Sequence, residues 1–243
     1  MNEENTIKGA ALVTGGAVRI GKSIAIKLAA LGYDIALHYN GSETEAVETK
    51  DRIEKYGVRC RTVKADFSNE DGFMRLADIA FDSFPDLNVL VNSASVFIRG
   101  HITDTGTSLF DTIMNINFKA PFFLSKKFGT LCKNGNIVNI LDVKITEHNS
   151  NYAAYNLSKK ALYELTLMSA KEFAPSIRVN GVAPGLILPP PGQNDGYLDR
   201  IAEKIPMKKK GSIENITGAV EFILKNDYIT GQVIFCDGGQ HLI

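Results

Sequence analysis

The chain has 243 residues, of which 44% are hydrophobic, so it can form one globular domain with a substantial core. Its 27 basic and 27 acidic residues balance and no long basic block occurs, which argues against nucleic acid as a partner. No apolar run reaches the length of a membrane span and the polar, acidic start does not look like a secretion signal, so we expect a soluble cytoplasmic protein without a membrane partner.

Short apolar runs rich in β-forming residues alternate with segments of helical periodicity. The expected strands are 10–14, 34–39, 58–66, 87–94, 135–141, 177–183 and 232–237. The expected helices are 19–31, 43–56, 69–83, 107–131, 152–173 and 212–225. This alternation is typical of βαβ units with right-handed crossovers. We therefore predict one doubly wound α/β (Rossmann) domain over residues 1–243, with a seven-stranded parallel sheet covered by helices on both faces and ligands at the carboxyl ends of its strands.

One long irregular stretch is expected late in the chain. Residues 184–196 contain four prolines and three glycines, which exclude regular structure. Loops of this length are commonly functional or disordered, and we expect a lid over a substrate site at about 186–204. The lysine run 208–210 is expected to be a solvated turn.

The three cysteines, Cys60, Cys132 and Cys236, are widely spaced and lack a metal-ligand pattern. We expect buried, reduced thiols, which fit a reducing compartment. The sequence therefore predicts no metal site.

The segment GGAVRIGKS, residues 15–23, fits two phosphate-binding patterns. Counted from Gly16 it matches the nucleotide-hydrolase loop G-x-x-x-x-G-K-S/T, in which Lys22 would contact phosphates and Ser23 would bind Mg²⁺. Counted from Thr14 it matches a dinucleotide-binding turn, in which glycines let the backbone approach a pyrophosphate at a helix N-terminus. The loop alone does not choose between them.

Tyr155 and Lys159 lie four residues apart in an expected helix and therefore share one of its faces. An ammonium near a phenol favours the phenolate, so we expect a lowered tyrosine pKa and a proton donor that works near neutral pH. Two surface residues that merely share a helical turn are the alternative. Asp142 ends the preceding strand, so the rim of the sheet can bring an acid, a phenol and an amine together.

A set of motifs, in order and spacing, resembles the short-chain dehydrogenase/reductase family over essentially the whole chain. These motifs are Thr14-Gly15 with Gly21, NSAS at 92–95, Asn117, Tyr155 with Lys159, Pro184-Gly185 and DGG at 237–239. Arg19 stands where the family has a glycine, and Asp142 stands where it has its catalytic serine. Both departures look like the pteridine and dihydromonapterin reductases. LHYNGS, ADFSNEDG, Phe97 and DGGQHL are similar to the same subgroup.

The cofactor is expected to be NADPH. No acid follows the strand 34–39 before Glu43 to bind a ribose 2′-hydroxyl, and Arg19 carries a forked donor array suited to a 2′-phosphate. The resemblance implies cofactor-binding residues Gly15, Arg19, Ile20, Gly21, His38, Tyr39, Asn40, Ser42, Asp66, Phe67, Asn92, Ala94, Ser95, Tyr155, Lys159, Pro184 and Gly185. A packed strand-end histidine is the alternative for His38, and a helix N-cap is the alternative for Asp66, expected on the adenine amino group.

The resemblance also implies the catalytic and substrate-binding residues. The catalytic set is Asp142, Tyr155, Lys159 and Asn117, the last holding a water in a proton relay toward Lys159. The substrate-binding set is Ser95, Phe97, Asp142, Tyr155 and Leu186. Phe97 is expected to stack a flat pterin ring against the nicotinamide, and a core position is its alternative.

The sequence thus predicts an NADPH-dependent reductase that converts a dihydropterin to its tetrahydro form, with the subunits assembled as a homotetramer. A carboxyl at 142 fits a C=N substrate, because it can hold an N–H or pass a proton from solvent. Three alternatives stay open: a reductase of a ketone such as a 3-oxoacyl thioester or a sugar, an NADPH-sensing module without catalysis, and a P-loop hydrolase. The hydrolase interpretation leaves Tyr155, Lys159, Asn92 and Asn117 without a role.

Overall fold

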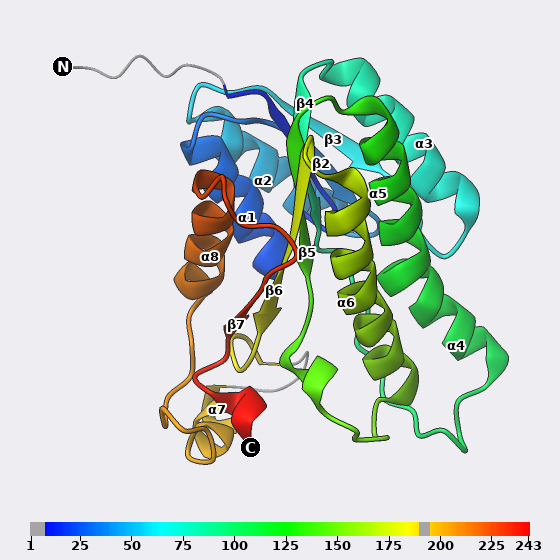
Figure 1. Ribbon diagram of the computed structural model, residues 1–243, viewed down its shortest axis with the longest axis vertical. Coiled ribbons are helices and arrows are strands. Elements are labelled where there is room, and N and C mark those ends of the chain that lie inside the picture. Colours follow the sequence, from blue (N-terminus) through cyan, green and yellow to red (C-terminus); the bar gives the residue numbers. More distant parts are fainter. Residues whose placement is uncertain (1–7, 190–194) are drawn as a thin grey trace.

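The computed structural model describes residues 8–189 and 195–243, and its centre is a parallel sheet of seven strands (Figure 1). The strands are β1 (Ala10–Val13), β2 (Asp34–Tyr39), β3 (Cys60–Lys64), β4 (Leu87–Asn92), β5 (Gly135–Ile140), β6 (Ile177–Pro184) and β7 (Val233–Cys236). Their order across the sheet is β3-β2-β1-β4-β5-β6-β7. The predicted doubly wound α/β fold is therefore confirmed.

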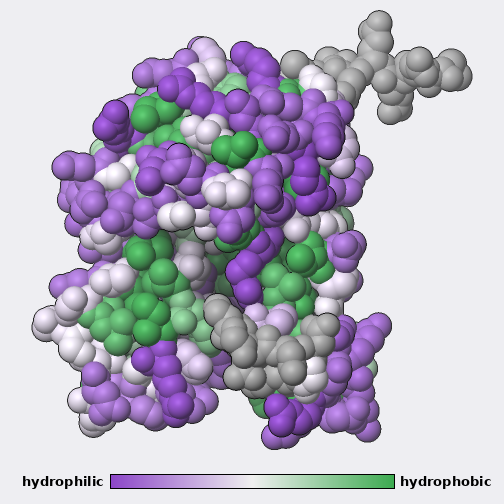
Figure 2. All heavy atoms as spheres, turned by 180° about the vertical axis from the view of Figure 1, so that it is seen from behind, coloured by the Kyte–Doolittle hydropathy of each residue, from purple (hydrophilic) through white to green (hydrophobic). Residues whose placement is uncertain are grey.

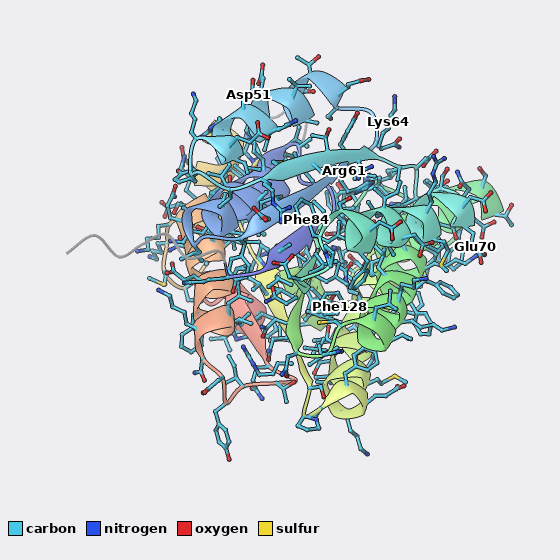
Figure 3. All side chains as sticks on the ribbon, turned by 90° about the horizontal axis from the view of Figure 1, so that it is seen from above. Asp51, Arg61, Lys64, Glu70, Phe84 and Phe128 are labelled. Atoms are coloured by element: carbon cyan, nitrogen blue, oxygen red, sulfur yellow. The ribbon has the colours of Figure 1, made fainter. Side chains whose placement is uncertain are left out.

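Helices cover both faces of this sheet (Figure 1). One face carries α1 (Arg19–Ala30), α2 (Glu43–Glu54) and α8 (Ile213–Lys225), and the other carries α3 (Glu70–Ser83), α5 (Ala120–Leu131) and α6 (Ala153–Phe173). Viewed from above, Phe84 and Phe128 lie in the interior, whereas Asp51, Lys64 and Glu70 lie on the outside (Figure 3). In the described part of the chain, no helix is both long and apolar enough to cross a bilayer.

The strands are apolar throughout because both of their faces are covered. In β1, Ala11 and Val13 pack in the core on the side of α1 and α8, while Ala10 and Leu12 pack in the core on the side of α3 and α5. All four residues are 2% exposed or less. Such a strand has no solvated face, so its sequence forms a continuous apolar run rather than an alternating one.

The strand order reverses beside β1. The chain adds β2 and β3 on one side of β1, and from β4 onward it builds the other side. The loops that leave β1 and β4 therefore diverge and open a crevice at the carboxyl ends of the strands. Residues that follow β1, β4, β5 and β6 all reach this edge.

The structure departs from the predicted elements in two places. The expected helix 107–131 is interrupted by a π-helical turn, η1 (Asn115–Lys119), between α4 (Thr107–Met114) and α5. The helix α7 (Asp195–Ala202) begins inside the stretch that was predicted to exclude regular structure, so that prediction is wrong at this end. Leu198 is buried and anchors the helix. Residues 190–194 of the predicted lid lie outside the described residues.

Candidate active site

A cavity of about 580 Å³ lies at the carboxyl ends of the central strands. Figure 2 shows the molecule hollowed on one side, with apolar surface along the hollow. The predicted site residues that line the cavity are Gly15, Arg19, Ile20, Gly21, Ala94, Ser95, Phe97, Asp142, Tyr155, Lys159, Pro184, Gly185 and Leu186. The fold therefore gathers residues from five separate loops and helices into one space.

Asp142 and Tyr155 form the central polar contact of this cavity. The Tyr155 hydroxyl donates a hydrogen bond of 2.6 Å to Oδ2 of Asp142. Asp142 follows β5 and caps the short 3-10 helix η2 (Val143–Thr146), because its Oδ1 accepts the backbone N–H of Lys144 at 2.9 Å. The carboxyl group is thus fixed from the strand side, and the phenol is brought to it by the first turn of α6.

Lys159 lies one turn further along α6 and is 3% exposed. Its Nζ donates to the carbonyl oxygen of Ile140 at 2.8 Å and lies 5.8 Å from the centre of the Tyr155 ring. Burial lowers the pKa of Lys159 to about 8, although the charge of Asp142 opposes this shift. The predicted meeting of an acid, a phenol and an amine is therefore present.

The protonation of Tyr155 differs from the prediction. Burial raises the pKa of its phenol well above 10.0, and both the charge of Asp142 and the hydrogen bond to it add to that rise. The expected lowering by Lys159 is wrong for this structure, because the carboxylate is in hydrogen-bond contact while the ammonium is directed to Ile140. The phenol of Tyr155 is consequently neutral at physiological pH.

Asn117 lies in η1, is fully buried, and does not line the cavity. Its side chain accepts from the N–H of Val96 at 2.9 Å and donates to the carbonyl of Val96 at 3.0 Å and to Ser158 Oγ at 3.1 Å. It joins the segment after β4 to α6, and the described structure gives it no contact with Lys159. A π-helical turn places this side chain inward. Its role in a proton relay stays a prediction.

The glycine turn is shaped by contacts that exclude side chains. Gly15 has a φ of 62°, and a Cβ on Gly21 would lie 2.2 Å from the carbonyl oxygen of Gly15. Thr14 closes the turn against the neighbouring strand, since its Oγ1 accepts the N–H groups of Ser93 at 2.9 Å and Ala94 at 3.0 Å. The sequence analysis recognised Thr14 as part of a motif but missed this contact.

Arg19, which was expected to bind a 2′-phosphate, contacts the segment after β6 in this structure. Its backbone is left-handed, with a φ of 51°, and its guanidinium donates to the carbonyl of Pro189 at 3.0 Å. Pro189 follows β6, whereas Asn40 and Ser42 follow β2 on the opposite side of β1. An exposed arginine can extend to either side of its helix terminus, so binding of a 2′-phosphate by Arg19 stays a prediction.

His38 and Tyr39 were predicted to bind the cofactor, and the structure places both in the protein interior. His38 is 3% exposed and Tyr39 is 9% exposed, and neither lines the cavity. The alternative of a packed strand-end histidine is therefore correct. Phe67 is also buried, with its ring stacked on His38 at 4.1 Å.

Asp66 is accessible at the end of β3, and its Oδ1 accepts the N–H of Ser68 at 2.8 Å and Nδ2 of Asn40 at 3.5 Å. The N-cap of α3 is Asn69, which accepts the N–H of Gly72 at 3.1 Å. Neither Asp66 nor Ser68 caps this helix, so the alternative given for Asp66 is wrong.

The predicted site residues at the end of β4 and in the segment after it differ in burial. Asn92 is buried and donates to Asn139 Oδ1 at 2.8 Å, which ties β4 to β5, and it does not line the cavity. Phe97 is 39% exposed, stacks on Tyr152 with 4.2 Å between ring centres, and meets Tyr155 edge-on. The core alternative for Phe97 is therefore wrong. Sequence reasoning missed Tyr152, whose only signal is its place before the helix that carries Tyr155.

A glycine turn at the crossover of a doubly wound sheet, together with a buried Tyr–Lys pair at the strand ends, defines the class of Rossmann-fold oxidoreductases. A family model described as enoyl-(acyl carrier protein) reductase matches residues 15–241. The chain belongs to the short-chain dehydrogenase/reductase family. Membership favours the dinucleotide interpretation of residues 15–23 over the hydrolase interpretation.

Its relatives include enzymes with different substrates. The chain is 31% identical to the 3-oxoacyl-(acyl-carrier-protein) reductase of Staphylococcus epidermidis, over 96% of this chain and 98% of that one. It is 33% identical to an uncharacterized oxidoreductase of Bacillus subtilis, over 95% of this chain and 98% of that one. Among solved structures, the FolM alternative dihydrofolate reductase 1 of Brucella suis, in complex with NADP, superposes with a TM-score of 0.92 at 34% identity, covering 97% and 96% of the two chains.

Proposed function

We propose that the protein is an NADP(H)-dependent reductase that converts a dihydropterin, such as dihydromonapterin, dihydrobiopterin or dihydrofolate, to the tetrahydro form. The observation that carries this proposal is the 2.6 Å hydrogen bond between Tyr155 and Asp142 inside the cavity. A carboxylate beside the proton donor suits a C=N bond, because it can accept a ring N–H or return a proton from solvent. A ketone needs only a hydrogen-bond donor at this position.

The glycine turn fits the pyrophosphate of NADP(H). The helix α1 begins without a side-chain cap and has no acidic residue in its first turn. Lys22 donates the first backbone bond of α1, so the N–H groups of Arg19, Ile20 and Gly21 have no backbone acceptor in the described residues. Such a helix N-terminus attracts anions. The Brucella enzyme that superposes on this chain contains NADP, which supports the same cofactor here.

The chain's own residues would supply the proton that the ring nitrogen takes up during the reduction, and would then replace it. Bound NADPH supplies the hydride for the carbon of the C=N bond. Tyr155, kept neutral by its burial and by Asp142, donates a proton to the ring nitrogen. Asp142, held by the N–H of Lys144, keeps the phenol in place. After the phenol has given up its proton, Asp142 would pass a proton from solvent to the phenolate. Lys159 would hold the nicotinamide ribose.

The wall of the cavity suits a flat ring. Phe97 and Tyr152 stack on each other with only 13° between their planes, and Phe97 presents an exposed surface beside Tyr155. A planar heterocycle packed there gains aromatic contact area next to the proton donor. Leu186 and Ser95 would complete the substrate pocket.

A 3-oxoacyl thioester reductase is the second candidate. It is favoured by the 31% identity to the Staphylococcus enzyme over nearly the whole chain. Asp142 would then accept a hydrogen bond without any part in proton transfer.

One comparison separates these functions. NADPH oxidation is followed with dihydromonapterin, dihydrobiopterin, dihydrofolate and a 3-oxoacyl thioester, for the wild type and for Asp142→Ser. We expect turnover with a dihydropterin, a loss of at least about tenfold in that activity for the variant, and poor turnover of the thioester. Rapid thioester reduction without pterin turnover would establish the second candidate. NADPH binding without turnover of any substrate would favour a sensing module.

We also propose that the subunits form a homotetramer through the layer of α4, α5 and α6. These helices carry exposed apolar side chains: Phe110, Phe122, Leu157 and Met168, which are 40%, 40%, 54% and 65% exposed. A second cavity, of about 280 Å³, lies between α4 and α6 and is lined by Phe110 and Leu157. An exposed apolar face of this kind suits a second copy of the chain.

A further inference from the structure

His38 binds the glycine turn twice. Its imidazole Nδ1 accepts the backbone N–H of Gly15 at 3.1 Å, and its own carbonyl oxygen accepts the N–H of Gly16 at 2.8 Å. Two consecutive amides of the turn are therefore held by one residue at the end of β2. Because Gly15 is in the left-handed region, with a φ of 62°, the hydrogen bond from its N–H helps to fix an orientation that local sterics alone leave open.

The opposite edge of the imidazole is bound to the end of β3. Nε2 lies 3.1 Å from the carbonyl oxygen of Ala65, and the ring stacks on Phe67 with 6° between the planes. A carbonyl can only accept, so the proton is on Nε2, and Nδ1 is left as the acceptor for Gly15. Burial lowers the pKa of His38 to about 4, which keeps this neutral tautomer at physiological pH.

We propose that His38 is a positioning residue that couples the phosphate-binding turn at Gly15 and Gly16 to the adenine-side loop at 65–67. His38 does not line the cavity. The inference rests on the proposed binding of NADP(H), whose pyrophosphate and adenine would meet these two segments. Holding both segments in one arrangement before binding reduces the entropic cost of ordering them, which strengthens cofactor affinity without altering the chemical step.

Two isosteric substitutions separate the two hydrogen bonds. In His38→Asn, Oδ1 occupies the place of Nδ1 and can still accept from Gly15, while the contact with Ala65 is lost. In His38→Gln, Nε2 occupies the place of the ring Nε2 and can still donate to Ala65, while the acceptor for Gly15 is lost. His38→Phe removes both contacts and keeps a ring for Phe67 to stack on.

The test measures the Kd of NADPH by fluorescence titration, and kcat at saturating NADPH. We expect His38→Gln and His38→Phe to raise the Kd about tenfold, because the turn loses its acceptor, and His38→Asn to raise it about threefold, because the turn keeps its acceptor but is no longer tied to residues 65–67. The kcat of all three variants should stay within about twofold of the wild type, because the reacting groups are untouched. Thermal unfolding of each variant fixes a temperature at which all are folded.

A wild-type Kd for His38→Gln or for His38→Asn would overturn the proposal and leave His38 as a space-filling residue. If the variants do not fold, the ¹⁵N signals of the wild-type imidazole decide: an Nδ1–H tautomer contradicts the proposal, and an Nε2–H tautomer with a Gly15 amide protected from exchange supports it. A wild type that does not bind NADPH overturns the proposed function instead, so the two failures are distinguishable.

Discussion

Asp142 affects the protonation of two other titratable side chains of the candidate site, Tyr155 and Lys159. It lies 2.6 Å from the phenol oxygen of Tyr155, and its charge raises the pKa of both Tyr155 and Lys159. For the phenol this adds to the effect of burial, and for the ammonium it opposes burial. The result is a phenol that stays protonated beside an amine whose pKa is about 8.

We expect kcat/KM to fall above about pH 8. Burial lowers the pKa of Lys159 to about 8, so the ammonium is present below this pH and is lost above it. Tyr155, with a pKa well above 10.0, contributes no step in this range. Rates measured between about pH 6 and 10 test this, because kcat/KM reports the groups of the free enzyme. Lys159→Met should be slow and lack the step, and a wild-type profile flat to about pH 10 would contradict the assignment.

His38 should make the fold sensitive to acid. Burial lowers its pKa from 6.5 to about 4, so the unfolded chain binds a proton between these values that the folded chain does not. The stabilisation is complete above about pH 6.5 and is lost as the pH falls toward about 4. Urea unfolding at about pH 7 and 4.5 should show the wild type losing about 2 to 3 kcal/mol more than His38→Phe. Equal losses in the two proteins would argue against a buried neutral imidazole.

Local spacing predicted the meeting of Asp142, Tyr155 and Lys159, since a strand end and the helix that follows it return to the same edge of the sheet. The direction of individual side chains was not predictable in the same way. In a strand covered on both faces, His38 and Tyr39 carry no alternation that marks which face meets a ligand. The long exposed side chain of Arg19 is directed by Pro189, which is distant in the sequence.

At the scale of elements, the turn between β1 and α1 is the most constrained part of the site. It needs a left-handed backbone at Gly15 and a close approach of the Gly15 carbonyl to Gly21. It also needs the two hydrogen bonds that backbone N–H groups of the segment after β4 donate to Thr14. The first residues of α1 line the cavity, and their N–H groups have no backbone acceptor among the described residues. A short glycine turn is sufficient for this because the strands on either side are buried and fixed.

Gly21→Ala should weaken NADPH binding by at least about tenfold. The added methyl group would meet the carbonyl oxygen of Gly15 at 2.2 Å, so the turn must shift away from its phosphate-binding shape. Gly218→Ala is the matched control, because its Cβ would point into open space on the exposed side of α8. Calorimetric titration with NADPH measures both. Unchanged affinity in Gly21→Ala would contradict the proposed position of the pyrophosphate.

Most helix and strand bounds were predictable to within a few residues, because apolar runs and helical periodicity alternate clearly in this chain. The exceptions have physical causes. The π-helical turn η1 follows from tertiary contacts of Asn117 with Val96 and Ser158, which leave no periodic signal. The helix α7 is short and follows prolines, and burial of Leu198 stabilises it against the local composition.

At the scale of the whole molecule, the sheet order puts the glycine turn and the Tyr–Lys helix on opposite sides of one crevice. The two helix layers are formed by different parts of the chain (Figure 1). The layer of α4, α5 and α6 holds the catalytic candidates on its inner side and exposed apolar residues on its outer side. Topology was predictable from the alternation of strands and helices, whereas contacts between copies leave no pattern of comparable strength.

The native mass tests the proposed assembly. A tetramer should have four times the subunit mass of 26.5 kDa by light scattering. Leu157→Glu places a charge on the exposed face of α6 and should dissociate it, because burying an unpaired carboxylate is costly. Val47→Glu is the control, since Val47 is 53% exposed on α2, in the other helix layer. A monomeric wild type, or a Leu157→Glu variant that keeps the wild-type mass, would contradict this interface.

Hydride transfer from NADPH to a C=N bond beside Tyr155 and Asp142 is the reaction proposed for this cavity. The most direct measurement uses NADPH that carries deuterium at the transferable position, with a dihydropterin as substrate, and analyses the product by mass spectrometry and NMR. The account predicts one deuterium on the carbon of the reduced C=N bond, and no transfer with Tyr155→Phe. A wild-type product without deuterium, or equal transfer by Tyr155→Phe, would contradict it.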